Sequence, residues 1–308
     1  MISAFPILGL LLHHPLGVDE TLEHLPQPGS LWAAHNWTWE FSITFPLVVF
    51  LMFYFFGALR RGNLRGLAWR HTAAIIGWLS LAFALVTPLH RLGDALFSAH
   101  MLQHEILVLL AAPLLAAAQC SVTLLYAFPI QWRRTLGSIF SGLQHNGLIA
   151  FLTAPLAAFL IHAFVLWGWH IPYLYEASVR SDLVHAFQHL SFFISGLIFW
   201  AALYGAGRSK MGYGAGVVYV FGTATHCGAL GALLTFSSVI WYPIYESRTH
   251  LWNLTPLQDQ QLGGLLMWVP SGLVFIVAGI WLFVQWLRHS EHRLVHSSVH
   301  DIPAGEEA

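Results

Sequence analysis

Seven long runs of apolar residues constrain the fold of this chain more than any other feature of its sequence. A helix needs roughly 20 apolar residues to cross about 30 Å of hydrocarbon. The runs that reach or approach this length are residues 41–59, 72–87, 97–118, 148–169, 183–204, 214–236 and 262–287. Only 9% of the residues are charged, whereas about a quarter are charged in a soluble domain. We therefore predict an all-α polytopic membrane protein, a seven-transmembrane-helix bundle.

The basic residues between these runs predict the orientation of the bundle. One side collects ten of them: Arg60, Arg61, Arg65, Arg70, Arg133, Arg134, Arg208, Lys210, Arg288 and Arg293. The other side collects three: Arg91, Arg180 and Arg248. Because Lys and Arg accumulate on the cytoplasmic side, we expect the N-terminus outside and the C-terminus in the cytoplasm, in a bacterial inner (plasma) membrane.

This orientation divides the chain into three parts. We predict an extracytoplasmic N-terminal segment (1–40), a seven-helix transmembrane domain (41–287) and a cytoplasmic tail that contains histidines (288–308). The apolar stretch 4–12 is too short to span a bilayer, so we expect it to lie at the outer interface. The histidines of the tail recur at helical spacing, which is typical of a solvated helix end and also allows metal binding.

Composition excludes several functional classes. The formal net charge of −1 provides no basic field, so we expect no nucleic-acid partner. Cys120 and Cys227 form no CxxC motif, and no nucleophile stands beside an activating base, so we do not expect an enzyme. The nineteen histidines are the main functional lead.

Two apolar runs begin with the same His-x-x-x-His spacing. His100 and His104 open the third run, and His185 and His189 open the fifth. Residues four apart share one helix face, and both runs enter from the outer side. All four imidazoles therefore lie at one level, roughly 5–10 Å below the outer interface. If the two helices face each other, they form an outer-leaflet nitrogen-rich site, and imidazole suits copper, zinc, iron and nickel.

Further histidines lie nearby. His170 is at the outer end of the fourth run, and His226 is near the middle of the sixth run, beside Cys227. A single intramembrane His is often a helix-to-helix hydrogen bond, whereas ionisable groups in a bilayer are costly and usually functional. The predicted metal ligands are His100, His104, His185, His189, His170 and His226, with Gln103 and Gln188 placed to orient the imidazoles.

Three sequence blocks resemble one known family. They are 96–104 (LFSAHMLQH), 169–175 (WHIPYLY) with the following His185 and His189, and 256–270 (PLQDQQLGGLLMWVP). These blocks resemble the CtaG family of cytochrome c oxidase assembly factors. The resemblance implies an assembly factor that delivers copper to the catalytic subunit of a haem–copper oxidase. Its partners would be an oxidase subunit, the lipid bilayer and an extracytoplasmic copper donor.

Three other hypotheses remain open from the sequence. A haem-binding or redox membrane protein would use axial His ligands from two helices. A proton-coupled transporter would use the histidines and Glu105 as a relay. A purely structural partner of the oxidase would need none of the histidines. Copper transfer has one weak point, because the chain holds only five Met and two Cys residues, and soft sulfur ligands favour cuprous ion.

Overall fold

The computed structural model describes residues 25–62, 66–145, 147–152, 154–205 and 211–300. Within these ranges all regular secondary structure is helical. The stretch 4–12 and the basic residues Arg65, Arg208 and Lys210 lie outside the described residues.

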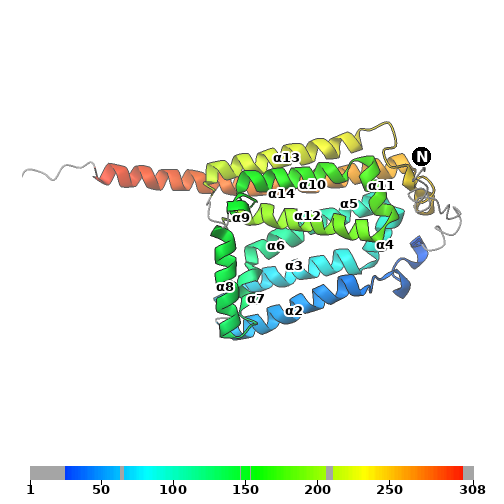
Figure 1. Cartoon of the computed structure of the whole chain (residues 1–308). Helices are drawn as coiled ribbons and strands as arrows, with labels where there is room; N and C mark the ends of the chain where they lie inside the picture. The colour runs from blue at the N-terminus through cyan, green and yellow to red at the C-terminus, as the bar shows by residue number, and fades with distance from the viewer. Residues whose placement is uncertain (1–24, 63–65, 146, 153, 206–210, 301–308) are drawn as a thin grey trace, which may run out of the picture.

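Most of the long helices run side by side (Figure 1). Their bounds are α2 (Phe41–Arg61), α3 (Ala68–Val86), α5 (Phe97–Glu105), α6 (Ala112–Ala118), α10 (Pro155–Trp169), α12 (Asp182–Leu203), α13 (Tyr213–Thr235) and α14 (Pro256–His300). A π-helical segment, η3 (Ile106–Ala111), joins α5 to α6.

Shorter helices connect them at the two ends. These are η1 (Pro28–Ser30), η2 (Ala34–Asn36), α4 (Pro88–Ala95), α7 (Cys120–Leu125), α8 (Ile130–His145), α9 (Gly147–Leu152), α11 (Pro172–Arg180), η4 (Pro243–Tyr245) and η5 (Thr249–Trp252). Helix α8 runs across one end of the bundle rather than along it, and α4 and α11 lie at the opposite end (Figure 1).

Six helical segments of the described chain are long and apolar enough to cross a membrane. They are α2, α3, residues 97–118, α12, α13 and the part of α14 up to Ser290. The pair α10 and α11, bent by 74°, makes a seventh if it is counted as one span. An all-helical protein with many membrane spans is therefore confirmed, at six or seven spans.

The fourth predicted run, 148–169, is divided between α9 and α10. Proline begins both helices of the bent pair, Pro155 in α10 and Pro172 in α11. Proline is favoured in the first helical turn, where its missing N–H costs nothing. It also disfavours the α conformation of the preceding residue, and Ile171 before Pro172 is extended. The bend therefore follows from the His170-Ile171-Pro172 sequence.

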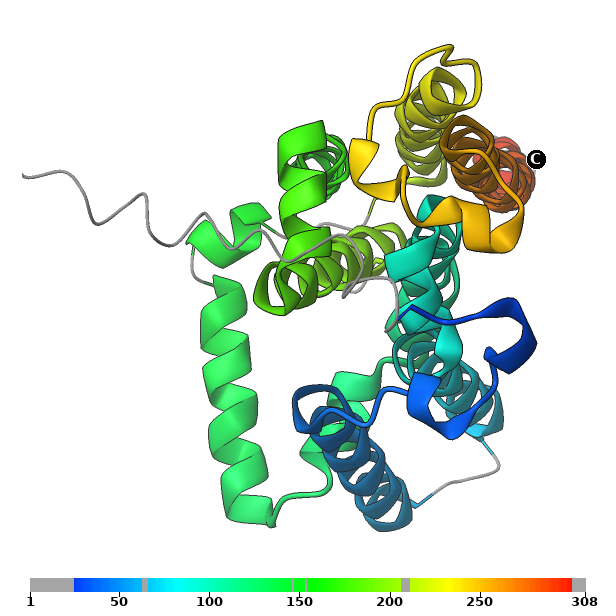
Figure 2. The same ribbon diagram turned by 90° about the vertical axis from the view of Figure 1, so that its right-hand side faces the viewer.

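Residues 97–118 form the centre of the bundle. In the view along the helices (Figure 2), this segment lies between α2 and α3 on one side and α13 and α14 on the other. Helix α5 packs on α14, and α6 packs on α3 and α12. Helices α13 and α14 meet closely at Gly231 and Gly264, because a Cβ on Gly264 would stand 2.7 Å from the Gly231 carbonyl oxygen. Small residues allow such approach in membranes.

Candidate metal centre

The two predicted His pairs face each other across the interface between α5 and α12. His100 and His104 extend from α5, and His185 and His189 extend from α12; all four are buried. Within each pair the two Nε2 atoms are 3.0 Å apart. Between the helices, the rings of His100 and His185 stack with centroids 4.9 Å apart. Ligand atoms of His100, His104 and His189 lie within 4.8 Å of one another, a spacing that one metal ion can bridge.

A fifth histidine completes the group. His90 comes from the short helix α4, and its ring stacks on that of His185 with centroids 5.1 Å apart. Ligand atoms of His90, His185 and His189 form a second triad within 4.8 Å. Burial lowers the pKa of His90 to about 3, so its imidazole is neutral near pH 7. We name these five residues, His90, His100, His104, His185 and His189, the five-histidine cluster.

His90 was not among the predicted ligands, because it lies between two predicted spans. The structure places His90 at the same end of the bundle as the start of α5, and Gly93 lies one turn further along α4. A Cβ on Gly93 would meet the Cα of His100 at 3.4 Å, so a small residue there lets α4 lie against α5.

Two glutamines hold the imidazoles. The Gln103 amide donates to the Ala84 carbonyl oxygen at 2.6 Å and to His90 Nδ1 at 2.9 Å. Gln188 Oε1 lies 3.1 Å from His100 Nε2. Both side chains are fully buried. The Gln188 oxygen can accept a hydrogen bond from His100, which is the direction found around metal-ligating imidazoles. The Gln103 amide instead positions the His90 ring by donating to it.

A carboxylate fixes the start of α5. Asp259 of α14 accepts hydrogen bonds from the backbone N–H groups of Phe97 and Ser98, at 2.6 and 3.1 Å, and from the Ser98 hydroxyl at 2.5 Å. A negative charge at a helix N-terminus is favourable because the first N–H groups lack intrahelical partners. Asp259 therefore fixes the helix turn that carries His100.

The cluster is suited to a metal ion. Imidazole is a good ligand for copper, zinc, iron and nickel. The Nδ1 atoms of His100 and His104 are buried and have no hydrogen-bond partner among the described residues. Unpaired buried polar atoms are costly, so nitrogen atoms left free in this way are consistent with a ligand-binding role.

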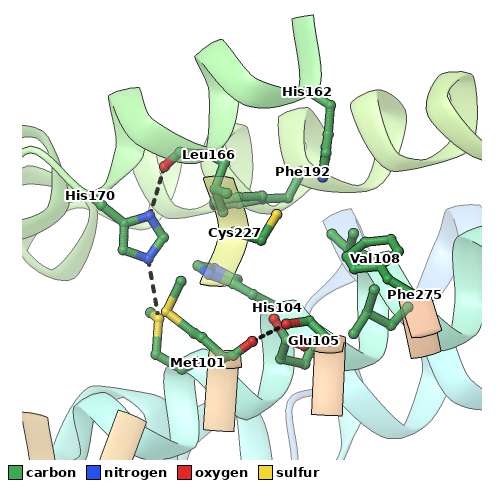
Figure 3. A pocket seen from close by; sticks show the side chains of 13 residues that line it. Met101, His104, Glu105, Val108, His162, Leu166, His170, Phe192, Cys227 and Phe275 are labelled. Atoms are coloured by element: carbon green, nitrogen blue, oxygen red, sulfur yellow. Dashed lines mark hydrogen bonds between the residues drawn. The ribbon is translucent and has the colours of Figure 1, made fainter. Parts of the chain in front are cut away.

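The structure places His170 and His226 away from this cluster. His170 donates from Nδ1 to the Leu166 carbonyl oxygen at 2.7 Å, and its Nε2 is 3.4 Å from Met101 Sδ (Figure 3). His226 Nδ1 lies 3.7 Å from Cys227 Sγ. Neither belongs to a triad of His, Cys or acidic side chains among the described residues. His170 is buried and His226 is half-buried.

A small cavity adjoins His104 outside the five-histidine cluster. Its volume is about 20 Å³, and His104, Glu105, His162, His170, Met101 and Cys227 are among its lining residues (Figure 3). Glu105 Oε2 is buried without a hydrogen-bond partner in the described part of the chain. The π-helical segment η3 begins directly after Glu105, and π-helical turns are frequent at functional sites.

Comparison with known proteins gives one family match. Residues 50–289 match the model of the cytochrome c oxidase caa3 assembly factor family. An uncharacterized protein of Mycobacterium bovis is 28% identical over 243 residues, which cover 76% of this chain and 36% of that protein. An uncharacterized protein of Mycobacterium leprae is 26% identical over 287 residues, covering 88% of this chain and 42% of that protein. The chain thus spans less than half the length of these curated relatives. No solved structure matches.

Proposed function

Because this chain belongs to the family of cytochrome c oxidase caa3 assembly factors, we propose that it binds copper at the five-histidine cluster and delivers it to the catalytic subunit of a haem–copper oxidase. The observation that carries this proposal is the convergence of five imidazoles, four buried and one half-buried, from α4, α5 and α12. Nitrogen ligands bind either oxidation state of copper. The oxidase subunit and an extracytoplasmic copper donor are its proposed partners.

The packing of the cluster favours an ion over a haem. The rings of His100 and His185 are in direct contact, with centroids 4.9 Å apart. Axial ligation of a haem needs two imidazoles on opposite faces of the porphyrin, each pointing one nitrogen at the iron, whereas these two rings stack directly on each other and leave no porphyrin plane between them. The space between the two helices therefore suits a single ion.

We propose that the N-terminus lies outside and the C-terminus in the cytoplasm, in the bacterial inner membrane. Arg60 and Arg61 end α2, and Arg133 and Arg134 lie in α8, at the same end of the bundle (Figure 1). The concentration of positive charge there supports a cytoplasmic location for this end. The five-histidine cluster, near α4 at the opposite end, would then receive copper from outside.

This orientation extends to the predicted parts of the chain. The proposed extracytoplasmic segment 1–40 precedes α2, and the proposed transmembrane domain is 41–287. The proposed cytoplasmic tail 288–308 begins within α14, whose helix continues to His300.

The proposal is tested in cells that lack the gene. The cells receive wild type, His100→Ala/His185→Ala, or the control His250→Ala, which changes an exposed histidine outside the cluster. We expect wild type and the control to restore the activity and copper content of the oxidase. The double variant, present at equal amount in the membrane, should leave the oxidase deficient in copper. A fully copper-loaded, active oxidase with the double variant would refute the proposal.

A further inference from the structure

The sulfur side chains of this chain are unevenly distributed. The whole chain has five Met and two Cys residues. Two of these methionines, Met101 and Met267, and one cysteine, Cys227, line the cavity of about 20 Å³ behind His104. They come from three different helices, α5, α14 and α13. Three of the chain's seven sulfur side chains therefore lie at one place, beside the five-histidine cluster.

The geometry of His170 leaves a lone pair directed at one of these sulfurs. Nδ1 lies 2.7 Å from the Leu166 carbonyl oxygen, so it must carry the proton and donate. In the neutral imidazole, Nε2 then holds a lone pair, and it lies 3.4 Å from Met101 Sδ (Figure 3). The thioether sulfur is also an acceptor. Two acceptors that face each other at this distance are suited to bind one cation between them.

The distance and the volume both fit a single ion. Metal–nitrogen and metal–sulfur bonds are about 2.0 and 2.3 Å in zinc sites, and together they exceed the 3.4 Å between Nε2 and Sδ. The two atoms can therefore share one ion at a bent angle. A cavity of about 20 Å³ has room for about one water-sized occupant.

The charge and softness of the lining select the ion. Thioether and thiol ligands prefer cuprous ion, whereas hard divalent ions prefer oxygen. A buried cation also needs a compensating charge, and the carboxyl of Glu105 lines the same cavity with one buried oxygen that has no hydrogen-bond partner in the described part of the chain. One carboxylate balances one cuprous ion.

We propose that this cavity is a second copper site, specific for cuprous ion, in which Met101 and His170 are ligands and Met267 and Cys227 supply further sulfur. His104 belongs to the five-histidine cluster and also lines the cavity, so it connects the two sites. Copper arrives already in the cuprous state, and no electron transfer is required. This inference rests on the proposed copper function and gives it a second, sulfur-containing site.

The test loads purified full-length protein with cuprous ion alone, without oxygen. Copper per chain is measured by mass spectrometry, and copper–sulfur scattering is measured by X-ray absorption. The test variant is Met101→Leu/Met267→Leu/Cys227→Ala. The matched control, Met52→Leu/Met211→Leu/Cys120→Ala, changes three sulfurs that do not line the cavity. Elution volume and thermal unfolding show whether each variant is folded.

We expect copper–sulfur scattering in wild type and control. The test variant should lose this scattering and should bind one copper fewer per chain. The single, volume-conserving Met101→Leu variant provides a second test if the triple variant does not fold. Its cuprous affinity should fall at least about tenfold, because the loss of a partner that only orients a ligand already has an effect of this size. Copper bound in wild type through nitrogen alone, or sulfur scattering unchanged in the test variant, would overturn the second site and leave the five-histidine proposal standing. Absence of any copper from wild type would contradict both.

Discussion

The central segment 97–118 and the peripheral helix α2 are both apolar enough to span a membrane, yet they differ in what surrounds them. In the most apolar stretch of residues 97–118, 61% of the residues are buried. In the most apolar stretch of α2, 11% of the residues are buried. The central segment carries His100, Gln103, His104 and Glu105, whereas α2 carries no ionisable residue before Tyr54. Ionisable groups are tolerated in a membrane where protein surrounds them. Burial by neighbouring helices is therefore what permits the polar site.

The two regions should differ most in how much stability they lose when a phenylalanine is replaced by alanine. Phe192 is 1% exposed and packs on His104 with ring centroids 4.3 Å apart, so Phe192→Ala should lower the free energy of unfolding by about 3–5 kcal/mol. Phe45 of α2 is 51% exposed, and Phe45→Ala should cost under about 1 kcal/mol. Denaturant unfolding in detergent measures both. Equal losses would contradict the contrast.

Two glycines of α14 sharpen the same contrast within one helix. A Cβ on Gly264 would meet backbone atoms of α13, including Thr235 N at 2.6 Å, whereas a Cβ on Gly279 would meet nothing within 4 Å. We expect Gly264→Ala to destabilise the protein by about 1–3 kcal/mol. Gly279→Ala should be neutral or stabilise by up to about 1 kcal/mol, because alanine favours the helix. Thermal unfolding of the two variants distinguishes them, and a stable Gly264→Ala protein would show that α13 and α14 are further apart.

A smaller effect is expected from the amide that orients His90. Gln103→Leu removes the hydrogen bond to His90 Nδ1 and should weaken copper binding about 10–100-fold, the usual effect of losing an orienting partner. Gln131→Leu on the exposed surface of α8 is the control and should leave affinity unchanged. Competition with a coloured copper chelator measures both. Unchanged affinity in Gln103→Leu would remove His90 from the proposed ligand set.

Most of the fold follows from apolar run length. The third span has the predicted bounds 97–118, and the predicted run 183–204 differs from α12 by one residue at each end. The bend after His170 was not predicted, because the apolar run ends at residue 169, before the Pro172 that causes the bend. The length of α14, 45 residues, was not predicted either, because polar residues do not stop a helix beyond the membrane.

Only the part of the candidate site with a repeated His-x-x-x-His spacing was predicted from the sequence. The His100–His104 and His185–His189 pairs share a spacing, so helix geometry predicted one depth for all four, whereas only the structure shows that α5 and α12 bring the two pairs together. His90 and the sulfur-lined cavity depend on how α4, α13 and α14 pack on α5, which no local pattern encodes. For His170 and His226, which lie apart from the cluster, metal binding stays a prediction.

Copper content of the purified protein tests the central claim most directly. Mass spectrometry of detergent-purified wild type is compared with His100→Ala/His185→Ala and with the control His250→Ala. We predict bound copper in wild type and control. The double variant should lose the copper held by the five-histidine cluster, about one ion per chain. A wild-type protein that holds no copper even after copper is added would contradict the account.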